Sequence, residues 1–216
     1  MYWNTVSPAL RAVLEDFSKS QIASEFYLAG GTALALQMGH RISLDLDFFS
    51  PTQSDISALT EPLRRALANH TPLLADTSWG NLVFLADNLR VGFYGYGYDL
   101  VRPLVKIESV SLASIEDIGL MKMDALLARA SRKDFHDLYQ ICQQVSLRDL
   151  FNLAPRKYPH MRDFEAQVTR HLVYFDRAEQ ESPVPLIRHV EWDTVKNWFR
   201  EQAKEIANHW LSDNHL

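Results

Sequence analysis

The hydrophobic pattern of this 216-residue chain changes its period near residue 113, and this change limits the folds that it can adopt. Up to that point, runs that alternate apolar and polar residues are interleaved with segments of helical spacing. From Ser114 onward the apolar residues recur only at helical spacing. We therefore predict an α+β protein, with a mixed sheet and its helices in residues 1–112 and a C-terminal helical bundle in residues 113–216.

The individual elements follow from the same pattern and from turn and capping residues. In the first part we expect helices at 8–22, 32–41 and 54–70, and strands at 25–31, 43–50, 73–78, 81–87, 89–101 and 104–113. In the second part we expect helices at 114–130, 131–145, 161–178 and 191–211. Ser7-Pro8, Ser114 and Ser131 supply the helix-start signals.

Cysteine content and hydropathy narrow the class of protein. The single cysteine, Cys142, excludes a disulfide framework and argues against a zinc site built on thiolates. Apolar runs stay below about 18 residues, and the first residues lack the basic and apolar regions of a signal peptide. We expect a cytoplasmic protein that makes no contact with a membrane.

Charge is unevenly distributed along the chain. The net charge is −5, which gives no overall signature of nucleic-acid binding. Residues 122–177, however, carry 10 basic side chains against 7 acidic ones. Either a local basic surface or ordinary solvated helix faces would produce this count.

A glycine pair stands where the first predicted strand passes into a helix. Gly30 and Gly31 follow an apolar run, and Thr32 is a candidate N-cap. Backbone N–H groups at a helix start bind anions, and glycines let an anion approach them. The pair is also explained by a plain strand-to-helix turn that requires positive φ.

Two aspartates interrupt the next apolar strand. Asp45 and Asp47 are two residues apart, so on a strand they share one face, about 6.5–7 Å apart. Burying ionised carboxylates is costly unless a cation faces them. Mg²⁺ binds through one or two carboxylates together with substrate phosphates, which would answer that requirement. The alternatives are a solvated strand face, or an arginine partner such as Arg41.

The stretch "LAGGTALALQMGHRISLDLDFFS" resembles the first motif of the AbiEii/AbiGii toxin family, a branch of the polymerase β-like nucleotidyltransferases. The segment "GFYGYGYDLV" and the stretch "LASIEDIGLMKMDALLARASRKDFHDLYQI" resemble later parts of that family, in the same order. The resemblance covers roughly residues 26–141. It implies a nucleotidyltransferase-type mixed sheet.

The resemblance also implies roles for particular residues. Gly30, Gly31 and Thr32 would hold a triphosphate, and Asp45 and Asp47 would hold Mg²⁺. Lys122 would contact phosphate or the nucleotide, and Asp134 would be the acid of the last motif, with Asp137 one turn later. Arg41, basic and close to the glycine pair, is a further candidate for a phosphate contact.

The residues of the last motif can also be interpreted without the family. Asp134 follows Ser131 by three residues and can be a cap. Lys133 and Asp137 can pair across one helical turn. Lys122 faces away from the apolar residues of its helix, which is typical of a solvated lysine. On this interpretation all three motif residues are structural.

One part of the family pattern is missing. Polymerase β-like enzymes commonly carry a third carboxylate on a neighbouring strand, as general base, but Arg90, Gly92 and Tyr94 occupy the expected face. Either the attacking group loses its proton otherwise, for example to Asp134, or the protein binds nucleotide with little turnover. The alternation of Tyr94, Tyr96 and Tyr98 favours a packed strand face over a base-stacking platform.

Two functions are therefore expected. The first is a Mg²⁺-dependent nucleotidyltransferase, the toxin of an AbiE-like type IV toxin–antitoxin pair, which transfers a nucleoside monophosphate from an NTP to an acceptor such as tRNA. Its RNA contacts would be Arg156, Lys157, Arg162 and Arg170, and a cognate antitoxin would be its partner. The alternative is a catalytically weak nucleotide-binding module, with a partner surface on helix 191–211 that uses Trp192, Trp198 and Trp210.

Overall fold

The computed structural model describes residues 1–78 and 80–213. Internal packing divides the chain into two compact units, Met1–Ile118 (unit 1) and Gly119–Leu216 (unit 2). The helix that begins at Ile115 contributes residues to both units. The domain boundary expected at residues 112/113 stays a prediction.

Unit 1 is built on a seven-stranded mixed sheet with the strand order β3-β4-β5-β2-β1-β7-β6. The pairs β2–β5 and β1–β7 are parallel, and the other neighbouring pairs are antiparallel. The strands are β1 (Tyr27–Ala29), β2 (Leu46–Ser50), β3 (Leu73–Ser78), β4 (Asn81–Ala86), β5 (Leu89–Gly95), β6 (Val105–Ile107) and β7 (Val110–Leu112).

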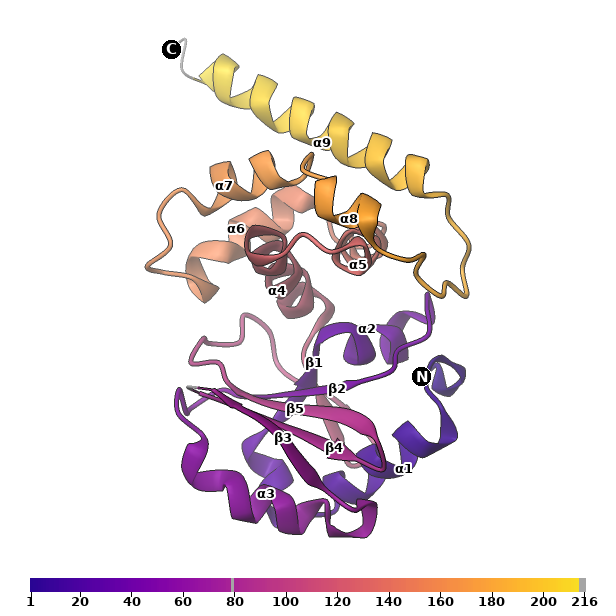
Figure 1. Ribbon diagram of the computed structural model, residues 1–216. Helices are drawn as coiled ribbons and strands as arrows, with labels where there is room; N and C mark the ends of the chain where they lie inside the picture. The colour runs from indigo at the N-terminus through magenta and orange to yellow at the C-terminus, as the bar shows by residue number, and fades with distance from the viewer. Residues whose placement is uncertain (79, 214–216) are drawn as a thin grey trace. The chain divides into compact units, whose positions relative to one another are not determined.

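Three α-helices accompany this sheet: α1 (Pro8–Ser18), α2 (Gly30–Met38) and α3 (Thr60–Ala66). Ser7 caps α1 by accepting a hydrogen bond from the Leu10 amide. Figure 1 shows α1 and α3 on one face of the sheet and α2 against the other. Short 3₁₀ helices, η1 (Trp3–Thr5), η2 (Gln21–Glu25), η3 (Ser57–Leu59) and η4 (Ala68–His70), complete the unit.

Several predicted boundaries were wrong. The helix expected at 8–22 ends at Ser18, and the one expected at 54–70 is α-helical only in α3. The strand expected from residue 43 begins at Leu46, because pairing with β5 starts at Leu46 and pairing with β1 at Asp47. Leu44, before the strand, is 68% exposed. The extended segment at 104–113 is a hairpin of β6 and β7, which turns at Glu108 with positive φ.

The core under the sheet is rich in phenylalanine. Phe17 of α1 packs on Phe48 of β2 at 4.4 Å and on Phe93 of β5 at 5.2 Å between ring centroids, and Phe26 packs on Phe93 at 5.3 Å. Aromatic pairs at such distances add to the gain from apolar burial. Because successive residues of a strand point to opposite faces, this packing of Phe48 directs Asp47 toward the α2 side.

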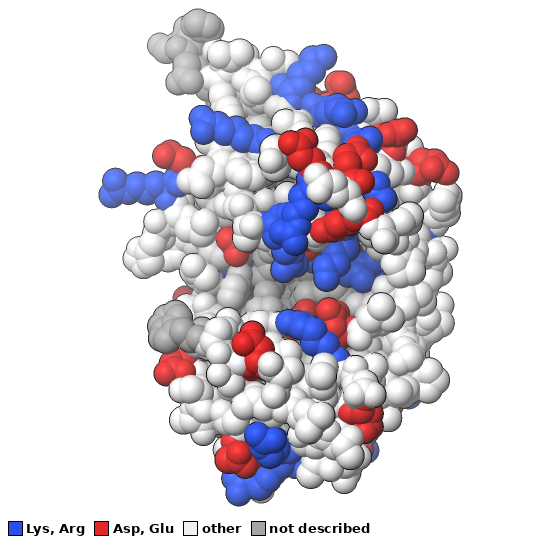
Figure 2. All heavy atoms as spheres, in the orientation of Figure 1, with Lys and Arg blue, Asp and Glu red and all other residues white. Residues whose placement is uncertain are grey.

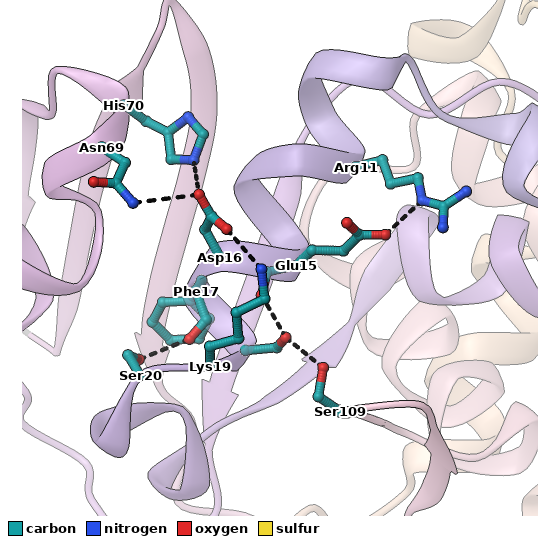
Figure 3. A network of polar contacts seen from close by, with 10 residues as sticks. Arg11, Glu15, Asp16, Phe17, Lys19, Ser20, Asn69, His70 and Ser109 are labelled. Carbon is teal, nitrogen blue, oxygen red and sulfur yellow. Dashed lines mark hydrogen bonds and ion pairs between the residues drawn. The ribbon is translucent and has the colours of Figure 1, made fainter.

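A polar network joins the end of α1 to η4 and to the β4–β5 turn. Asp16 accepts hydrogen bonds from Lys19 at 2.9 Å and Asn69 at 3.4 Å, and its Oδ2 lies 3.3 Å from His70 Nε2 (Figure 3). The other ring nitrogen of His70 lies 2.9 Å from Asp87 Oδ2, in the β4–β5 turn. His70 thus joins α1, η4 and that turn.

Unit 2 is helical, as the sequence predicts. Its helices are α4 (Ile115–Ala128, shared with unit 1), α5 (Arg132–Ile141), α6 (Leu147–Lys157), α7 (Phe164–His171), α8 (Asp176–Gln180) and α9 (Trp192–Asp213). No helix was predicted over α6, which contains Pro155 and is capped by Ser146. Phe135 is at the centre of the aromatic core, 5.0 Å from Phe175 and 5.4 Å from Phe199. Among the helices of residues 1–78 and 80–213, none is long and apolar enough to cross a membrane.

Candidate active site

The glycine pair forms the turn between β1 and α2. Gly30 has a φ of +63°, which an L side chain rarely adopts, and α2 starts at this residue. The N-cap position is Ala29, which has no side chain able to cap, so Thr32 is not the N-cap that the sequence suggested. The Thr32 hydroxyl donates to the carbonyl oxygen of Asp45 and lies 2.8 Å from Ser43 Oγ. Thr32 therefore fixes the approach to β2.

Gly31 is needed because a guanidinium packs directly against it. A Cβ at this position would lie 2.0 Å from Arg41 Nη2. Arg41 is buried, and its Nη1 donates to the carbonyl oxygen of Ile42 at 2.9 Å. A positive charge is thus held beside the first turn of α2, where the helix dipole is also positive. A phosphate contact of Arg41 stays a prediction.

Asp45 and Asp47 lie beside the glycine turn with a common cation. Arg90 Nη1 on β5 is 2.9 Å from Asp47 Oδ1 and 3.9 Å from Asp45 Oδ2. Tyr94 donates to the same Asp47 Oδ1 at 3.2 Å and accepts a hydrogen bond from Arg90. Asp47 Oδ2 faces the turn, 3.2 Å from where a Cβ of Gly30 would be. Arg90 therefore meets both carboxylates as a cationic partner.

The charges of this cluster perturb one another. Burial and the neighbouring charge of Asp45 raise the pKa of Asp47, and Arg90 only partly offsets them. Burial and the charge of Asp47 raise the pKa of Tyr94 to about 12. Burial lowers the pKa of Arg90, but Tyr94 and Asp47 outweigh it and raise that pKa overall. Burial and the second carboxylate therefore disfavour the charged form of Asp47, and a cation that binds here would favour it.

The strand face opposite the carboxylates is closed to a third acid. Parallel pairing of β2 and β5 sets Asp47 against Gly92. A Cβ at residue 92 would lie 2.4 Å from the Tyr94 hydroxyl, because the Tyr94 ring lies across this position. The sequence prediction that Arg90, Gly92 and Tyr94 share the face next to the aspartates is confirmed.

The residues present fit Mg²⁺ as a cation that shares its coordination with a substrate. Within the described part of the chain, no group of three or more His, Cys, Asp or Glu side chains could hold a metal ion. Two carboxylates suffice for Mg²⁺ when phosphate and water oxygens complete its shell. With Asp47 Oδ1 engaged by Arg90 and Tyr94, the oxygen that faces the glycine turn is Oδ2.

The three residues of the last motif meet inside unit 2. Lys122 Nζ of α4 is 2.9 Å from Asp134 Oδ1 and 2.6 Å from Asp137 Oδ2 on α5. All three side chains are buried. The solvated lysine suggested by residue spacing is wrong, because α5 packs over that side of α4.

Asp134 accepts hydrogen bonds from three side chains, those of Lys122, Arg129 and Ser131. Arg129 Nε and Nη2 donate to its two oxygens at 2.8 and 2.9 Å, and Ser131 Oγ donates at 2.6 Å. Burial raises the pKa of Asp134, but Lys122, Arg129 and Ser131 outweigh burial and hold it well below its usual range. The side chain of Ser131 makes no cap hydrogen bond to the backbone, so a mere capping role for Asp134 does not describe this site.

The sequence family can be read from two comparisons. Residues 12–75, which contain the glycine turn and the carboxylate pair, match the family model described as "Nucleotidyl transferase AbiEii toxin, Type IV TA system". The uncharacterized protein aq_aa25 of Aquifex aeolicus (strain VF5) is 31% identical over 206 residues, which cover 90% of this chain and 94% of the relative. The chain belongs to the AbiEii family.

Solved structures confirm the predicted α+β nucleotidyltransferase-type fold for this AbiEii-family chain. JHP933 from Helicobacter pylori is 18% identical with a TM-score of 0.51, over 96% of this chain and 92% of that one. MenT4, a nucleotidyltransferase toxin from Mycobacterium tuberculosis H37Rv, is 13% identical with a TM-score of 0.51, over 86% of this chain and 80% of that one. At such identities the similarity shows the fold alone.

The four basic residues expected to contact RNA differ in exposure in this AbiEii-family chain. Arg156, Arg162 and Arg170 are exposed, but Lys157 is 0% exposed. Lys157 as an RNA contact is therefore wrong, because it lies on the inward side of α6. On the face drawn in Figure 2, basic side chains lie among acidic ones and do not form an area of one sign.

The tryptophan helix of the AbiEii-family chain packs within its own unit. Trp192 is 5.9 Å from Phe135, and Trp198 is 5.5 Å from Tyr139, between ring centroids. Trp210 Nε1 donates to Glu165 of α7 at 3.2 Å. These tryptophans are half-buried, which leaves a smaller partner surface on α9 than the sequence suggested.

Two arginines that complete the two clusters of this AbiEii-family chain were not predicted as partners of the aspartates. The sequence placed Arg90 only on the strand face where a third carboxylate was expected, and it predicted no role for Arg129. Both pairings span elements, Arg90 to Asp47 across 43 residues and Arg129 to Asp134 across a helix junction. The usable signal was the carboxylate itself, since a buried acid requires a cationic partner.

Proposed function

We propose that this chain is a Mg²⁺-dependent nucleotidyltransferase, the toxin of a type IV toxin–antitoxin pair, which transfers a nucleoside monophosphate from an NTP to an acceptor such as tRNA. The observation that carries the proposal is the carboxylate pair beside an uncapped glycine turn. Asp47 Oδ2 is an anionic group that lies beside Gly30, and the helix start at Gly30 has no side-chain cap. A metal–triphosphate complex is the ligand that uses both.

Gly30, Gly31 and Thr32 would hold the triphosphate through the backbone of the first turn of α2. The Thr32 hydroxyl is already engaged with Asp45 and Ser43, so its part is to keep the turn and the carboxylates in register. Arg41 adds positive charge against Gly31. Asp45 and Asp47 would hold Mg²⁺, which when bound neutralises charge on the phosphates that react.

In the transfer, the acceptor hydroxyl oxygen forms a bond to the α-phosphorus, and the bond from that phosphorus to the bridging β-phosphate oxygen breaks. Pyrophosphate leaves with the electron pair, and the hydroxyl proton passes to solvent. Positioning and charge stabilisation supply most of the catalysis in such a reaction, because its transition state is loose. A dedicated base beside Asp47, where Gly92 and Tyr94 lie, is therefore not required.

We assign Lys122, Asp134 and Asp137 a supporting role. A carboxylate whose pKa is held well below its usual range is a poor general base, which argues against proton removal by Asp134. Asp134 and Asp137 instead hold Lys122 in a fixed place between α4 and α5. A phosphate or nucleotide contact of Lys122 remains part of the proposal.

The acceptor assignment rests on exposed basic side chains and on the family. Arg156, Arg162 and Arg170 offer phosphate contacts, and each would add to the salt dependence of RNA binding. Partners in this proposal are an NTP, an RNA acceptor and a cognate antitoxin, with the cytoplasm as location.

The test is incubation of the protein with each labelled NTP, Mg²⁺ and total RNA, alongside Asp47→Asn. We expect labelled RNA with the parent and a loss of orders of magnitude in the variant, which keeps the shape of the side chain but not its charge. Without nucleotide the variant should melt at the same temperature or higher, because the repulsion between Asp45 and Asp47 is gone and Arg90, 43% exposed, can be solvated. Labelled RNA with neither protein, or with both equally, would refute the proposal.

A second candidate is a nucleotide-binding module with little turnover. Arg90 and Tyr94 in the place of a third carboxylate are the observation that favours it. Melting with each NTP and Mg²⁺, next to the transfer assay, separates the two. Stabilisation without transfer to any RNA would favour the module.

A further inference from the structure

The carboxylate pair of unit 1 already has a cation of its own. Arg90 donates to Asp47 Oδ1 at 2.9 Å, and its Nη1 is 3.9 Å from Asp45 Oδ2. A single guanidinium thus lies within ion-pair distance of both candidate metal ligands. Metal ions serve the same purpose in two-metal sites, where a pair of cations neutralises the charge of carboxylates and phosphates.

Arg90 is held in this position by a second side chain. Its Nη2 donates to the Tyr94 hydroxyl, which in turn donates to Asp47 Oδ1 at 3.2 Å. The Tyr94 ring can lie there because residue 92 is glycine; a Cβ would come within 2.7 Å of ring atoms. The ring also stacks on Phe49 of β2, at 5.0 Å between centroids. Arg90 is therefore positioned by packing as well as by charge.

We propose that Arg90 is a resident cation that takes the place of one divalent ion, so that a single divalent ion binds at Asp45 and Asp47. This inference rests on the proposed function, because it takes these carboxylates to be metal ligands. The two oxygens of Asp47 differ in a way that agrees with this proposal. Oδ1 accepts hydrogen bonds from Arg90 and Tyr94, while Oδ2 faces the glycine turn.

The resident charge has a measurable consequence for metal affinity. A divalent ion that binds this pair does so against the field of a guanidinium that touches the same carboxylate. Removing that positive charge should tighten binding of the ion, and keeping the charge on a different side chain should not. Without metal, removing it should destabilise unit 1, since the two carboxylates then repel with no cation between them.

The test measures Mn²⁺ binding to the full chain by electron paramagnetic resonance of the free ion, without nucleotide. The variants are Arg90→Gln, Arg90→Lys and Asp47→Asn. Arg102→Gln is the matched control. Arg102 is about as exposed as Arg90 and pairs with Glu116 at 3.1 Å, and its substitution removes the same net charge. Melting temperatures with and without Mn²⁺ are recorded for each protein.

We expect one Mn²⁺ per chain in the parent, about tenfold tighter binding in Arg90→Gln, which corresponds to about 1.4 kcal/mol, and parent-like binding in Arg90→Lys and Arg102→Gln. Arg90→Gln should also melt lower without Mn²⁺ and recover with it. Two ions per chain in the parent, or no gain in Arg90→Gln over Arg102→Gln, would overturn the role of Arg90. If Asp47→Asn then still abolishes binding, the proposed function survives. Binding that is absent from the parent and from Arg90→Gln overturns the role of Arg90, while the transfer assay with NTP and Mg²⁺ decides the proposed function separately.

Discussion

Substituting Lys122 with methionine tests whether the last motif is a buried ionic cluster. The change keeps the length of the side chain and removes the one ammonium that bridges Asp134 and Asp137. Both carboxylates are fully buried, and breaking a buried ion pair by removing one partner costs about 3–5 kcal/mol. Because each kcal/mol shifts the melting temperature of a chain of this size by roughly 2–4 °C, the variant should melt about 6–20 °C lower.

The matched control is Arg129→Met, which removes another partner of the same Asp134. Arg129 is 47% exposed, so its loss should cost at most about 1 kcal/mol. Guanidinium unfolding at pH 7, followed by circular dichroism, gives both free energies. A double variant, Lys122→Met with Asp137→Leu, should recover most of the loss, because apolar residues can replace a buried ion pair at little cost. It should not recover nucleotide binding if Lys122 contacts nucleotide.

The pH dependence of stability is an independent test of the ionic cluster. The pKa of Asp134 is lowered in the folded protein, so its contribution is fully present above its usual value of about 3.9 and is lost as the pH falls through the lowered pKa. In Lys122→Met a buried carboxyl has lost its cation and is easier to protonate, so the deficit against the parent should narrow between pH 7 and pH 4. A variant that is no less stable than Arg129→Met at pH 7 would refute the reasoning.

Two further predictions concern unit 1. His70 lowers the pKa of Asp87, so Asp87 contributes stability above pH 4 that is lost as the pH falls further; in His70→Asn melting temperatures should therefore depend less steeply on pH below 4 than in the parent. Gly31→Ala should destabilise by about 1–3 kcal/mol, measured in denaturant, because the new Cβ overlaps the Arg41 guanidinium, and adding Arg41→Ala should reverse most of this overpacking. An unchanged slope in the first case, or an unaltered midpoint in the second, would contradict the contacts described.

The fold was predictable from the sequence because hydrophobic period and turn residues are local signals. The alternation around Asp47 and the helical spacing after Ser114 each report on the residues beside them. Predicted boundaries were wrong where pairing with neighbouring strands decides them. Leu44 fits the alternation, yet it lies outside the sheet because β2 pairs with β5 only from Leu46 and with β1 only from Asp47. α6, which contains Pro155 and is capped by Ser146, was not predicted.

The candidate site was predictable only for residues that are close along the chain. The glycine turn and the carboxylates are separated by one helix, and motif resemblance links them. The pairing of Asp47 with Arg90 depends on the register of β2 against β5, which no local pattern specifies. The burial of Lys122 likewise depends on how α5 crosses α4. Residue spacing alone therefore predicted that Lys122 is exposed to solvent.

The Tyr94 ring over Gly92 also restricts how this protein could change. An acid directly opposite Asp47 would stand at residue 92, where a Cβ would lie 2.4 Å from the Tyr94 hydroxyl. Gly92→Asp alone therefore meets an occupied space, and replacing Tyr94 alone releases Arg90 without adding an acid. An acid at residue 92 and the present positions of Tyr94 and Arg90 therefore exclude each other.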